Sequence, residues 1–200
     1  MRVIGGQAKG RRLKTLKGRS LRPTADRVKE ALFNILPHNL SGYNVLDLFA
    51  GTGNLSLEAL SRGGAEALMV DSSRAAAKAI KENLRALGLD HKSKVWTTPV
   101  LQSIRRLSRD GKAFDIIFLD PPYEKGLVGQ TLRAIAQGGL LREEGVLVTE
   151  HSVREKLENA YGPLILQDQR RYGTTLLSFF IYDRSATFDK DREATWQTPR

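Results

Sequence analysis

The stretch FDIIFLDPPY, residues 114–123, places residues that could do chemistry at the end of a predicted buried strand. Asp120 offers a carboxylate that can accept an N–H hydrogen bond from an amino group, and the carbonyl of Pro121 can accept a second one. Pro121 and Pro122 have no N–H and a fixed φ, which stiffens that carbonyl. Tyr123 offers a flat face for an unstacked base, an interaction worth roughly 1–3 kcal/mol. These four residues suit a site that holds a planar amine and directs its lone pair at an electrophile.

A glycine turn ends another predicted strand, at residues 43–49. The stretch DLFAGTG covers residues 47–53, and its small residues let the backbone approach a ligand closely. The GxGxxG spacing of dinucleotide-binding folds is absent, because Leu55 and Ser56 follow the second glycine. This absence weakens a pyrophosphate role and favours a nucleoside without phosphates. Taken alone, the glycines indicate only a tight strand-to-helix turn.

An acid, Asp71, ends the strand predicted at residues 66–71. A carboxylate at this place can accept both hydroxyls of a ribose, although alone it could equally be a helix N-cap. The glycine turn, this acid and the DPPY motif occupy three strand ends of one chain. Their combination favours a shared ligand site over three unrelated turns.

The sequence predicts an α/β fold in which these strand ends meet at one edge of a sheet. Apolar runs predict five strands that alternate with helices, and this alternation indicates a mostly parallel sheet covered on both faces. In such sheets, ligands bind outside the carboxyl ends of the strands, where the strand order switches. The strands are expected at 43–49, 66–71, 93–98, 114–120 and 145–151, helices within 22–36, 51–64, 74–89, 101–109, 127–139 and 154–162, and a late strand pair with an antiparallel edge within 163–183.

The positive charge is concentrated at the N-terminus. The net charge is +10, and residues 1–29 hold ten Lys or Arg against one acid, so this segment alone carries +9. Such a segment indicates a polyanion partner, with nucleic acid preferred over a solvated arm or an anionic membrane surface. We expect residues 1–37 to form a basic β-hairpin and helix that bind nucleic acid, residues 38–184 to form the α/β domain, and residues 185–200 to be a disordered tail.

Other function classes are disfavoured by composition. The absence of cysteine excludes disulfides and thiolate metal sites and suits a cytoplasmic protein. The three histidines, His38, His91 and His151, are far apart, so we read them as surface or loop residues and expect no metal. No apolar run reaches 18 residues and the start lacks the apolar region of a secretory signal, so no membrane partner is expected. Nothing in the sequence demands more than a monomer.

The combination of VLDLFAGTG with DPPY resembles the class I S-adenosylmethionine-dependent methyltransferases that act on exocyclic amino nitrogens. RVIGGQAKGRRL and RPTADRVKEALFNIL resemble one branch more closely, the bacterial 16S rRNA guanine(966)-N2 methyltransferases. The resemblance runs from Met1 to about Asp183. It implies a Rossmann-like class I methyltransferase sheet, S-adenosylmethionine as cofactor, and 16S rRNA or the small ribosomal subunit as partner.

The resemblance also implies roles for individual residues. Asp120, Pro121, Pro122 and Tyr123 would form the target-base site, Asp71 would hold the ribose hydroxyls, and Phe49, Ala50, Gly51 and Gly53 would border the methionine part of the cofactor, with Asp47 near its amino group. Where the family often bonds the adenine amine, this chain has Thr97, Thr98 and Pro99, so only the Thr98 hydroxyl could serve. RNA would be held at the pocket mouth by Arg11, Arg12, Lys14, Arg19 and Arg22, with Arg105, Arg106, Arg170 and Arg171 as weaker candidates.

Three alternatives stay open at this stage. DPPY is shared with N6-adenine and N4-cytosine DNA methyltransferases, but these usually need a larger target-recognition region than this chain offers. A non-catalytic RNA-binding assembly protein would not need the intact motif and glycine turn. A nicotinamide-dependent oxidoreductase lacks support, because the third glycine and a Tyr-Lys proton relay are missing.

Overall fold

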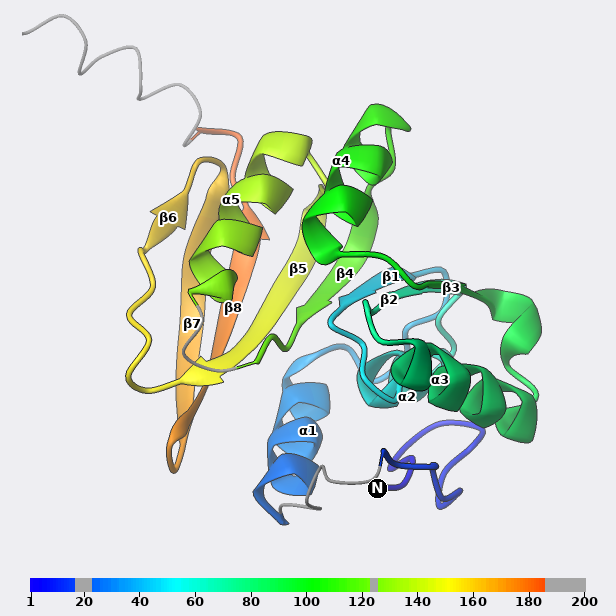
Figure 1. The fold of residues 1–200 in the computed structure, drawn as a ribbon. Coiled ribbons are helices and arrows are strands. Elements are labelled where there is room, and N and C mark those ends of the chain that lie inside the picture. Colours follow the sequence, from blue (N-terminus) through cyan, green and yellow to red (C-terminus); the bar gives the residue numbers. More distant parts are fainter. Residues whose placement is uncertain (17–22, 123–125, 186–200) are drawn as a thin grey trace, which may run out of the picture.

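The computed structural model describes residues 1–16, 23–122 and 126–185 (Figure 1). Within these residues eight strands form one sheet in the order β3-β2-β1-β4-β5-β8-β7-β6. Strands β1 to β5 pair in parallel, and β5-β8-β7-β6 pair antiparallel. The strands are β1 Asn44–Leu48, β2 Glu66–Val70, β3 Ser93–Trp96, β4 Phe114–Leu119, β5 Leu141–Ser152, β6 Ala160–Tyr161, β7 Leu164–Tyr172 and β8 Thr175–Tyr182. The predicted fold class, a mostly parallel sheet with an antiparallel edge, is confirmed.

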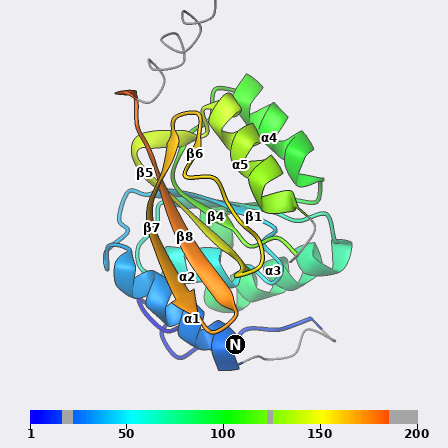
Figure 2. The same ribbon diagram turned by 90° about the vertical axis from the view of Figure 1, so that its left-hand side faces the viewer.

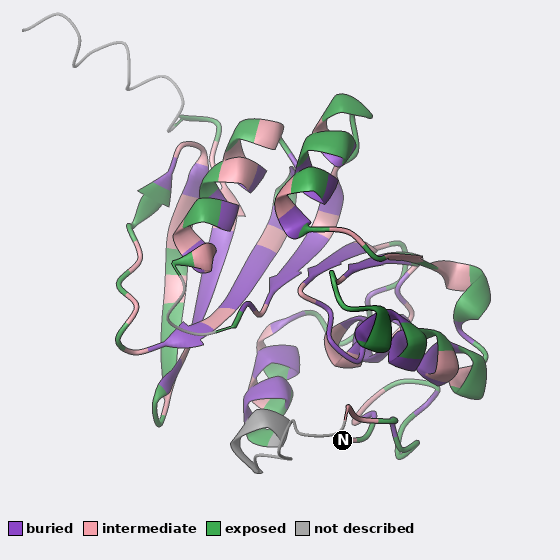
Figure 3. Cartoon of the chain, viewed as in Figure 1, coloured by how far each residue is buried: buried purple, intermediate pink, exposed green. Residues whose placement is uncertain are grey.

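Helices cover both faces of the sheet, as Figure 2 shows from the side. They are α1 Pro23–Ile35, α2 Asn54–Ser61, α3 Arg74–Leu87, α4 Val100–Arg109 and α5 Leu127–Gly138, with a short 3₁₀ turn η1 at Asp90–Lys92. Buried side chains of α1, α2 and α3 form one core cluster with alternate residues of the strands. Those of α4 and α5 form a second cluster on the opposite face. Figure 3 shows the result: the central strands are buried, and the outward sides of the helices are exposed.

The chain order switches between β1 and β4, which lie side by side although β2 and β3 intervene in the sequence. All four of Val45, Leu46, Asp47 and Leu48 are buried, because neighbouring strands and helices enclose β1 on every side. Strands of this kind read as continuous apolar runs, so they are predictable from sequence. The carboxyl ends of β1 and β4 meet at the place where the sequence predicts a ligand site.

The helix predicted at residues 154–162 is wrong. The chain there forms turns and the two-residue strand β6, Ala160–Tyr161. Tyr161 packs edge-on against Phe180 of β8, with ring centroids 5.9 Å apart. Its hydroxyl accepts a hydrogen bond from the backbone N–H of Glu158 at 3.0 Å. These contacts hold the chain at Tyr161 against the sheet edge in an extended conformation. A helix over residues 154–162 could not make them.

The expectation that all three histidines lie on the surface or in loops is wrong for His151. His38 and His91 are exposed, but His151 is fully buried in β5, where its Nε2 lies 2.8 Å from the Ser178 hydroxyl. Burial lowers the pKa of the His151 imidazole, which favours its neutral form. The strand continues to Ser152 because it pairs with β8, and this pairing carries the histidine into the core.

The N-terminal segment does not form the predicted regular β-hairpin. Residues 1–13 make a compact loop closed by a single antiparallel bridge between Arg2 and Arg12, and the loop packs on the end of α2. The N–H groups of Gln7 and Ala8 donate to the carbonyl and hydroxyl of Ser61, at 2.8 and 2.9 Å. Val3, Ala8 and Leu13 join the core cluster formed by α1, α2 and α3. The basic segment is therefore part of the folded body.

The predicted disordered tail falls mostly on residues 186–200, which lie outside the described residues. No helix among residues 1–16, 23–122 and 126–185 is long and apolar enough to cross a bilayer.

We predict that Gly6→Ala undocks the N-terminal loop. Gly6 has φ of +70°, and a Cβ built there would lie 1.8 Å from the Ser61 carbonyl oxygen. Hydrogen exchange at the Gln7 and Ala8 amides should become much faster, and the free energy of unfolding should fall by at least about 2 kcal/mol.

The matched control is Gly10→Ala, because Gly10 also has a positive φ of +84° but nothing within 4 Å of its added Cβ. This variant carries only the backbone strain, about 1 kcal/mol. Equal effects of the two substitutions would contradict a steric role for Gly6.

Candidate active site at the carboxyl edge of the sheet

The register of the parallel strands lines up the predicted site residues. Leu48 pairs with Val70 on one side and with Leu119 on the other, so the next residues, Phe49, Asp71 and Asp120, stand in one row. Leu119 pairs with Thr149, which extends the row to Glu150. Neighbouring strands lie about 4.8 Å apart, so consecutive members of this row are within reach of one small ligand.

A cavity of about 100 Å³ opens at this row. It joins the loop after β1 to the end of β4, since Asp47, Phe49 and Ala50 line it together with Asp120. The rest of its wall comes from the N-terminus, α1, the start of α2 and β5, namely Met1, Val28, Lys29, Leu32, Thr52, Asn54, Leu55 and Glu150. The structure thus brings two of the three predicted strand-end motifs into one cavity.

The loop after β1 has a strained backbone that opens the cavity. Phe49 has φ of +67° and is the one non-glycine residue with positive φ among the described residues. Gly51 and Gly53 also have positive φ, and Gly53 caps α2. A non-glycine residue in this region costs of order 1–3 kcal/mol and is typical of functional sites. The loop places the N-terminal end of α2 beside the strand-end row, where Asn54 and Leu55 line the cavity.

Asp71 holds this loop in place. One of its carboxylate oxygens accepts the N–H of Gly51 at 2.8 Å, and the other accepts the N–H of Ser73 at 2.8 Å. Each oxygen keeps a second lone pair, and the side chain is only partly buried, so the carboxylate can still bind a hydroxyl pair. The predicted binding of ribose hydroxyls by Asp71 is therefore compatible with its hydrogen bond to the loop at Gly51, which the sequence did not reveal.

Asp47 is a buried acid in the wall of the cavity. Its side chain is 2% exposed and accepts a hydrogen bond from the Ser56 hydroxyl at 2.8 Å. Burial raises the pKa of Asp47 to about 7, while the hydrogen bonds from Ser56 lower it and the charge of Asp71 adds a smaller upward push. An acid held in this way gains most from a ligand that brings a positive charge.

Of the DPPY motif, the structure describes Asp120, Pro121 and Pro122. Asp120 is partly buried and faces the cavity, Pro121 is buried, and Pro122 is exposed. Tyr123 lies outside the described residues. The chain thus stays close to the protein interior through Pro121 after β4 ends at Leu119, and it reaches the surface at Pro122.

Thr98 stands after β3 and does not line the cavity. Its hydroxyl lies 2.5 Å from that of Ser103, on the first turn of α4, and this contact supports the helix start. The predicted contact with a ligand through Thr98 stays a prediction.

Three polar residues of the cavity wall, Lys29, Asn54 and Glu150, were not singled out from the sequence. The ammonium of Lys29 is 2% exposed and donates to the Asn54 side chain at 2.9 Å and to the Arg2 carbonyl at 2.6 Å. It also pairs with Glu58, which is fully buried, at 3.3 Å. From the sequence alone, Lys29 cannot be distinguished from the other basic residues of an amphipathic helix, because its partner Glu58 is far away in the chain.

Of the expected RNA-binding residues, Arg11, Arg12 and Lys14 lie on the docked N-terminal segment. Arg12 is exposed, whereas the Arg11 guanidinium donates to the Ala86 carbonyl at 2.6 Å, and the Lys14 ammonium pairs with Glu82 at 2.5 Å. Arg11 and Lys14 therefore also fasten the segment to α3. Arg19 and Arg22 lie outside the described residues.

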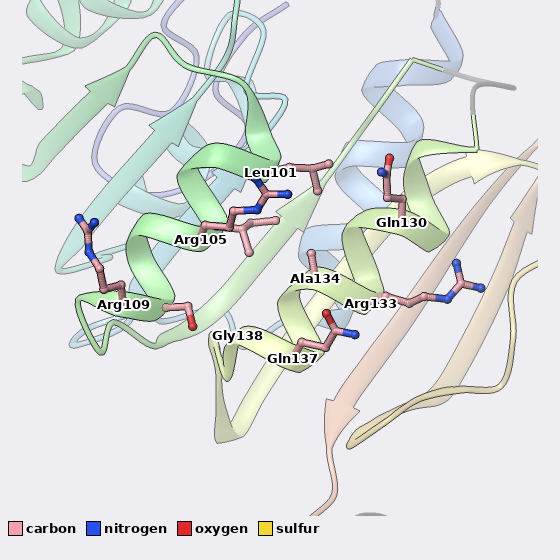
Figure 4. A pocket seen from close by; sticks show the side chains of 10 residues that line it. Leu101, Arg105, Arg109, Gln130, Arg133, Ala134, Gln137 and Gly138 are labelled. Atoms are coloured by element: carbon pink, nitrogen blue, oxygen red, sulfur yellow. The ribbon is translucent and has the colours of Figure 1, made fainter.

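A larger cavity, of about 570 Å³, lies between α4 and α5 and away from the strand-end row (Figure 4). Arg105, Arg109 and Arg133 reach around it, and among the described residues its lining shares only Arg105, a weak RNA candidate, with the predicted site residues. Among the described residues no group of three His, Cys, Asp or Glu could hold a metal ion. The cavity at the strand-end row is the candidate site.

Comparisons with known proteins cover nearly the whole chain. The family described as "Conserved hypothetical protein 95" matches residues 1–181. YlbH of Bacillus subtilis is 37% identical over 180 residues, which are 90% of this chain and 98% of that protein. "Ribosomal RNA small subunit methyltransferase D" of Escherichia coli is 33% identical over 195 residues, covering 96% of this chain and 94% of the relative. The solved structure of the Escherichia coli protein yhhF has a TM-score of 0.80 at 33% identity, over 92% of this chain and 98% of that one.

We predict that Asp47→Asn stabilises the protein more at pH 8 than at pH 5. The pKa of Asp47 is about 7 in the folded state and near 3.8 in the unfolded state, so the unliganded protein loses stability as pH rises from about 4 through 7. The amide carries no charge, so this loss should disappear from the variant. Urea unfolding at both pH values measures the difference.

The control is Asp90→Asn, an exposed acid next to β3. Its substitution should change stability by less than about 0.5 kcal/mol at either pH. Destabilisation of the Asp47 variant at pH 8 would contradict the buried-charge account.

Proposed function

This chain belongs to the Conserved hypothetical protein 95 family, and from this premise we propose that it transfers a methyl group from S-adenosylmethionine to RNA of the small ribosomal subunit. The acceptor in this proposal is the exocyclic N2 of a guanine, of the guanine(966) kind. The relatives named as ribosomal RNA small subunit methyltransferase D support the reaction class and the RNA. The single observation that carries the proposal is the cavity that joins the β1 loop to Asp120.

The residues around this cavity fit the proposed cofactor. The buried Asp47, with its raised pKa, suits the positive α-ammonium of a methionine moiety. Ala50 lines the cavity, Gly51 and Gly53 allow the positive φ of the loop, and Asp71 at the neighbouring strand end offers acceptors for the ribose hydroxyls. When bound, the cofactor supplies an activated methyl group on a sulfonium.

The amine of a base is a poor nucleophile, because its lone pair is delocalised into the ring. The Asp120 carboxylate can accept one N–H of this amine and the Pro121 carbonyl the other, which favours a pyramidal nitrogen. The acceleration then comes mainly from positioning two reactants in line. The proton of the methylated nitrogen leaves readily, so no strong base is required of the protein. Tyr123 is the proposed stacking face for the base, which must leave its own RNA stack to enter the cavity.

The N-terminal segment is the proposed RNA contact. Its positive charge would bind phosphates and set the register of the RNA without reading sequence. The loop reaches the cavity wall through Met1 and is fastened to α2 and α3, so RNA bound to it lies at the mouth of the site. Residues 1–37 are in this view a functional unit, although they share their core with the rest of the chain.

We predict that Asp120→Ala binds S-adenosylhomocysteine with near-normal affinity but loses at least about 100-fold in methyl transfer to small-subunit RNA. The reason is that Asp120 would contact the base amine and not the part of the cofactor that anchors it. Calorimetry measures the first quantity, and transfer of labelled methyl followed by nucleoside analysis measures the second.

Asp90→Ala is the matched control and should keep both properties. Turnover near the wild-type value in the Asp120 variant would remove this residue from the chemistry. Methylated adenine or cytosine in the product would instead favour the rival amine specificities.

We predict that Arg12→Glu weakens RNA binding and lowers the steepness of its salt dependence by roughly one unit in log–log slope. Arg12 is preferred over Arg11 for this test, because Arg11 also binds the Ala86 carbonyl. Fluorescence anisotropy with small-subunit RNA at several salt concentrations measures both effects.

The control Lys112→Glu makes the same charge change in the loop before β4, at the amino edge of the sheet. It should leave RNA binding close to that of the wild type. Cofactor affinity should be unchanged in both variants, and equal RNA affinities for Arg12→Glu and the wild type at low salt would exclude Arg12 from the binding surface.

A further inference from the structure

Glu150 is a second carboxylate in the target-base part of the cavity. It stands beside Asp120, because Leu119 of β4 pairs with Thr149 of β5 and the two acids are the next residues on adjacent strands. Both acids line the same cavity. Their side chains also share a face of the sheet, since each follows by two positions a residue of the core cluster under α1, Phe118 and Val148 respectively.

The surroundings make this position unusual for an acid. Glu150 is partly buried, and its cross-strand partner on β8 is the fully buried Leu177. Placing a carboxylate among such neighbours costs free energy unless hydrogen-bond donors or a positive charge face it. Lys29 lines the same cavity and supplies positive charge to it. Because Glu150 is only partly buried, its carboxylate can also accept hydrogen bonds from a ligand.

The bases differ in what they offer two neighbouring acids. Guanine presents three donors along one edge, the N1–H and the two N–H groups of N2. Adenine presents its N6 amine beside the bare N1, and cytosine presents its N4 amine beside the bare N3. An ionised carboxylate only accepts hydrogen bonds, so it attracts the N1–H of guanine and repels the lone pair that adenine or cytosine would put in the same place.

We propose that Glu150 is a specificity-determining residue that accepts the N1–H of the target guanine while Asp120 accepts an N–H of its N2 amine. This inference rests on the proposed function, because it takes the base amine to be bound at Asp120. It supplies a physical reason for guanine where the DPPY motif alone accounts only for an exocyclic amine. Enzymes that act on unstacked bases commonly read this edge of the base.

The test crosses two enzymes with two substrates. The RNA is small-subunit RNA carrying at the target position either guanosine or the riboside of 2-aminopurine, which keeps the N2 amine but has a bare N1. The enzymes are the wild type and Glu150→Ala, compared by kcat/KM. The intrinsic difference in reactivity between the two bases cancels in this comparison, and so does any general damage to the enzyme.

We expect Glu150→Ala to lose roughly 10- to 100-fold on the guanosine RNA, the range for a hydrogen bond to a charged group. On the 2-aminopurine RNA it should be unchanged or faster, because a repulsive contact is removed. Glu150→Gln sharpens the test, since its amide can donate to the bare N1 and should raise activity on 2-aminopurine above that of the wild type. It also keeps the size of the side chain, so it carries the test where the alanine variant fails to fold.

Glu144→Ala, at an exposed position near the start of the same strand, should behave as the wild type on both RNAs. Equal losses on the two RNAs for both Glu150 variants would overturn the inference and leave the proposed function intact. Absence of N2-methylguanosine from the wild-type reaction with guanosine RNA would overturn the proposed function itself.

Discussion

The parallel pairing of β1 with both β2 and β4 is the constraint from which the site follows. The register places Phe49 between Asp71 and Asp120, although these residues are separated by up to 71 positions in the chain. A shift of one residue in any of these pairings would turn every side chain of the shifted strand to the opposite face and move its acid out of the row. The buried apolar residues of β1 and β4 prevent such a shift, since it would place core residues against the wrong helices. The packing of the sheet therefore positions the chemistry.

A buried cluster of hydrogen bonds and ion pairs around Glu58 fastens the N-terminal loop to the wall of the cavity. The carboxylate of Glu58 accepts from the Ile4 N–H at 2.8 Å, from Arg62 at 3.0 Å and from Lys29 at 3.3 Å. Removing one member of such a group leaves an uncompensated buried charge, which is costly. On the other side of the loop, the Asn83 side chain bonds the backbone of Lys14 and the carbonyl of Thr52. The loop that is proposed to bind RNA and the wall of the cavity are thus held together by the same buried contacts.

The parts of this structure that could be predicted from the sequence are those with a local sequence pattern. Continuous apolar runs ending at Asp71 and Asp120 predicted both the strands and the acids that follow them. Glu150 gave no such signal, because β5 continues past it to Ser152 in order to pair with β8. The same continuation buried His151, whose partner Ser178 is distant in the chain. The segment 154–162 has a helical composition, but contacts of Tyr161 with the sheet override it. Long-range pairing is the common cause of these failures.

Charge explains why the cavity suits a cationic cofactor together with a donor-rich base. Among the described residues, the lining holds three carboxylates, Asp47, Asp120 and Glu150, and one basic side chain, Lys29. Lys29 also pairs with Glu58, so its positive charge is divided between Glu58 and the carboxylates of the cavity. Burial raises the pKa of Asp47 to about 7, so the charged form of this acid is disfavoured in the unliganded protein. A ligand that brings a sulfonium and an ammonium would relieve this cost, and the N–H groups of a guanine would add hydrogen bonds to the acids of the wall. An anionic or acceptor-rich ligand would increase the repulsion, so the charge of the cavity wall supports the two reactants of the proposed function.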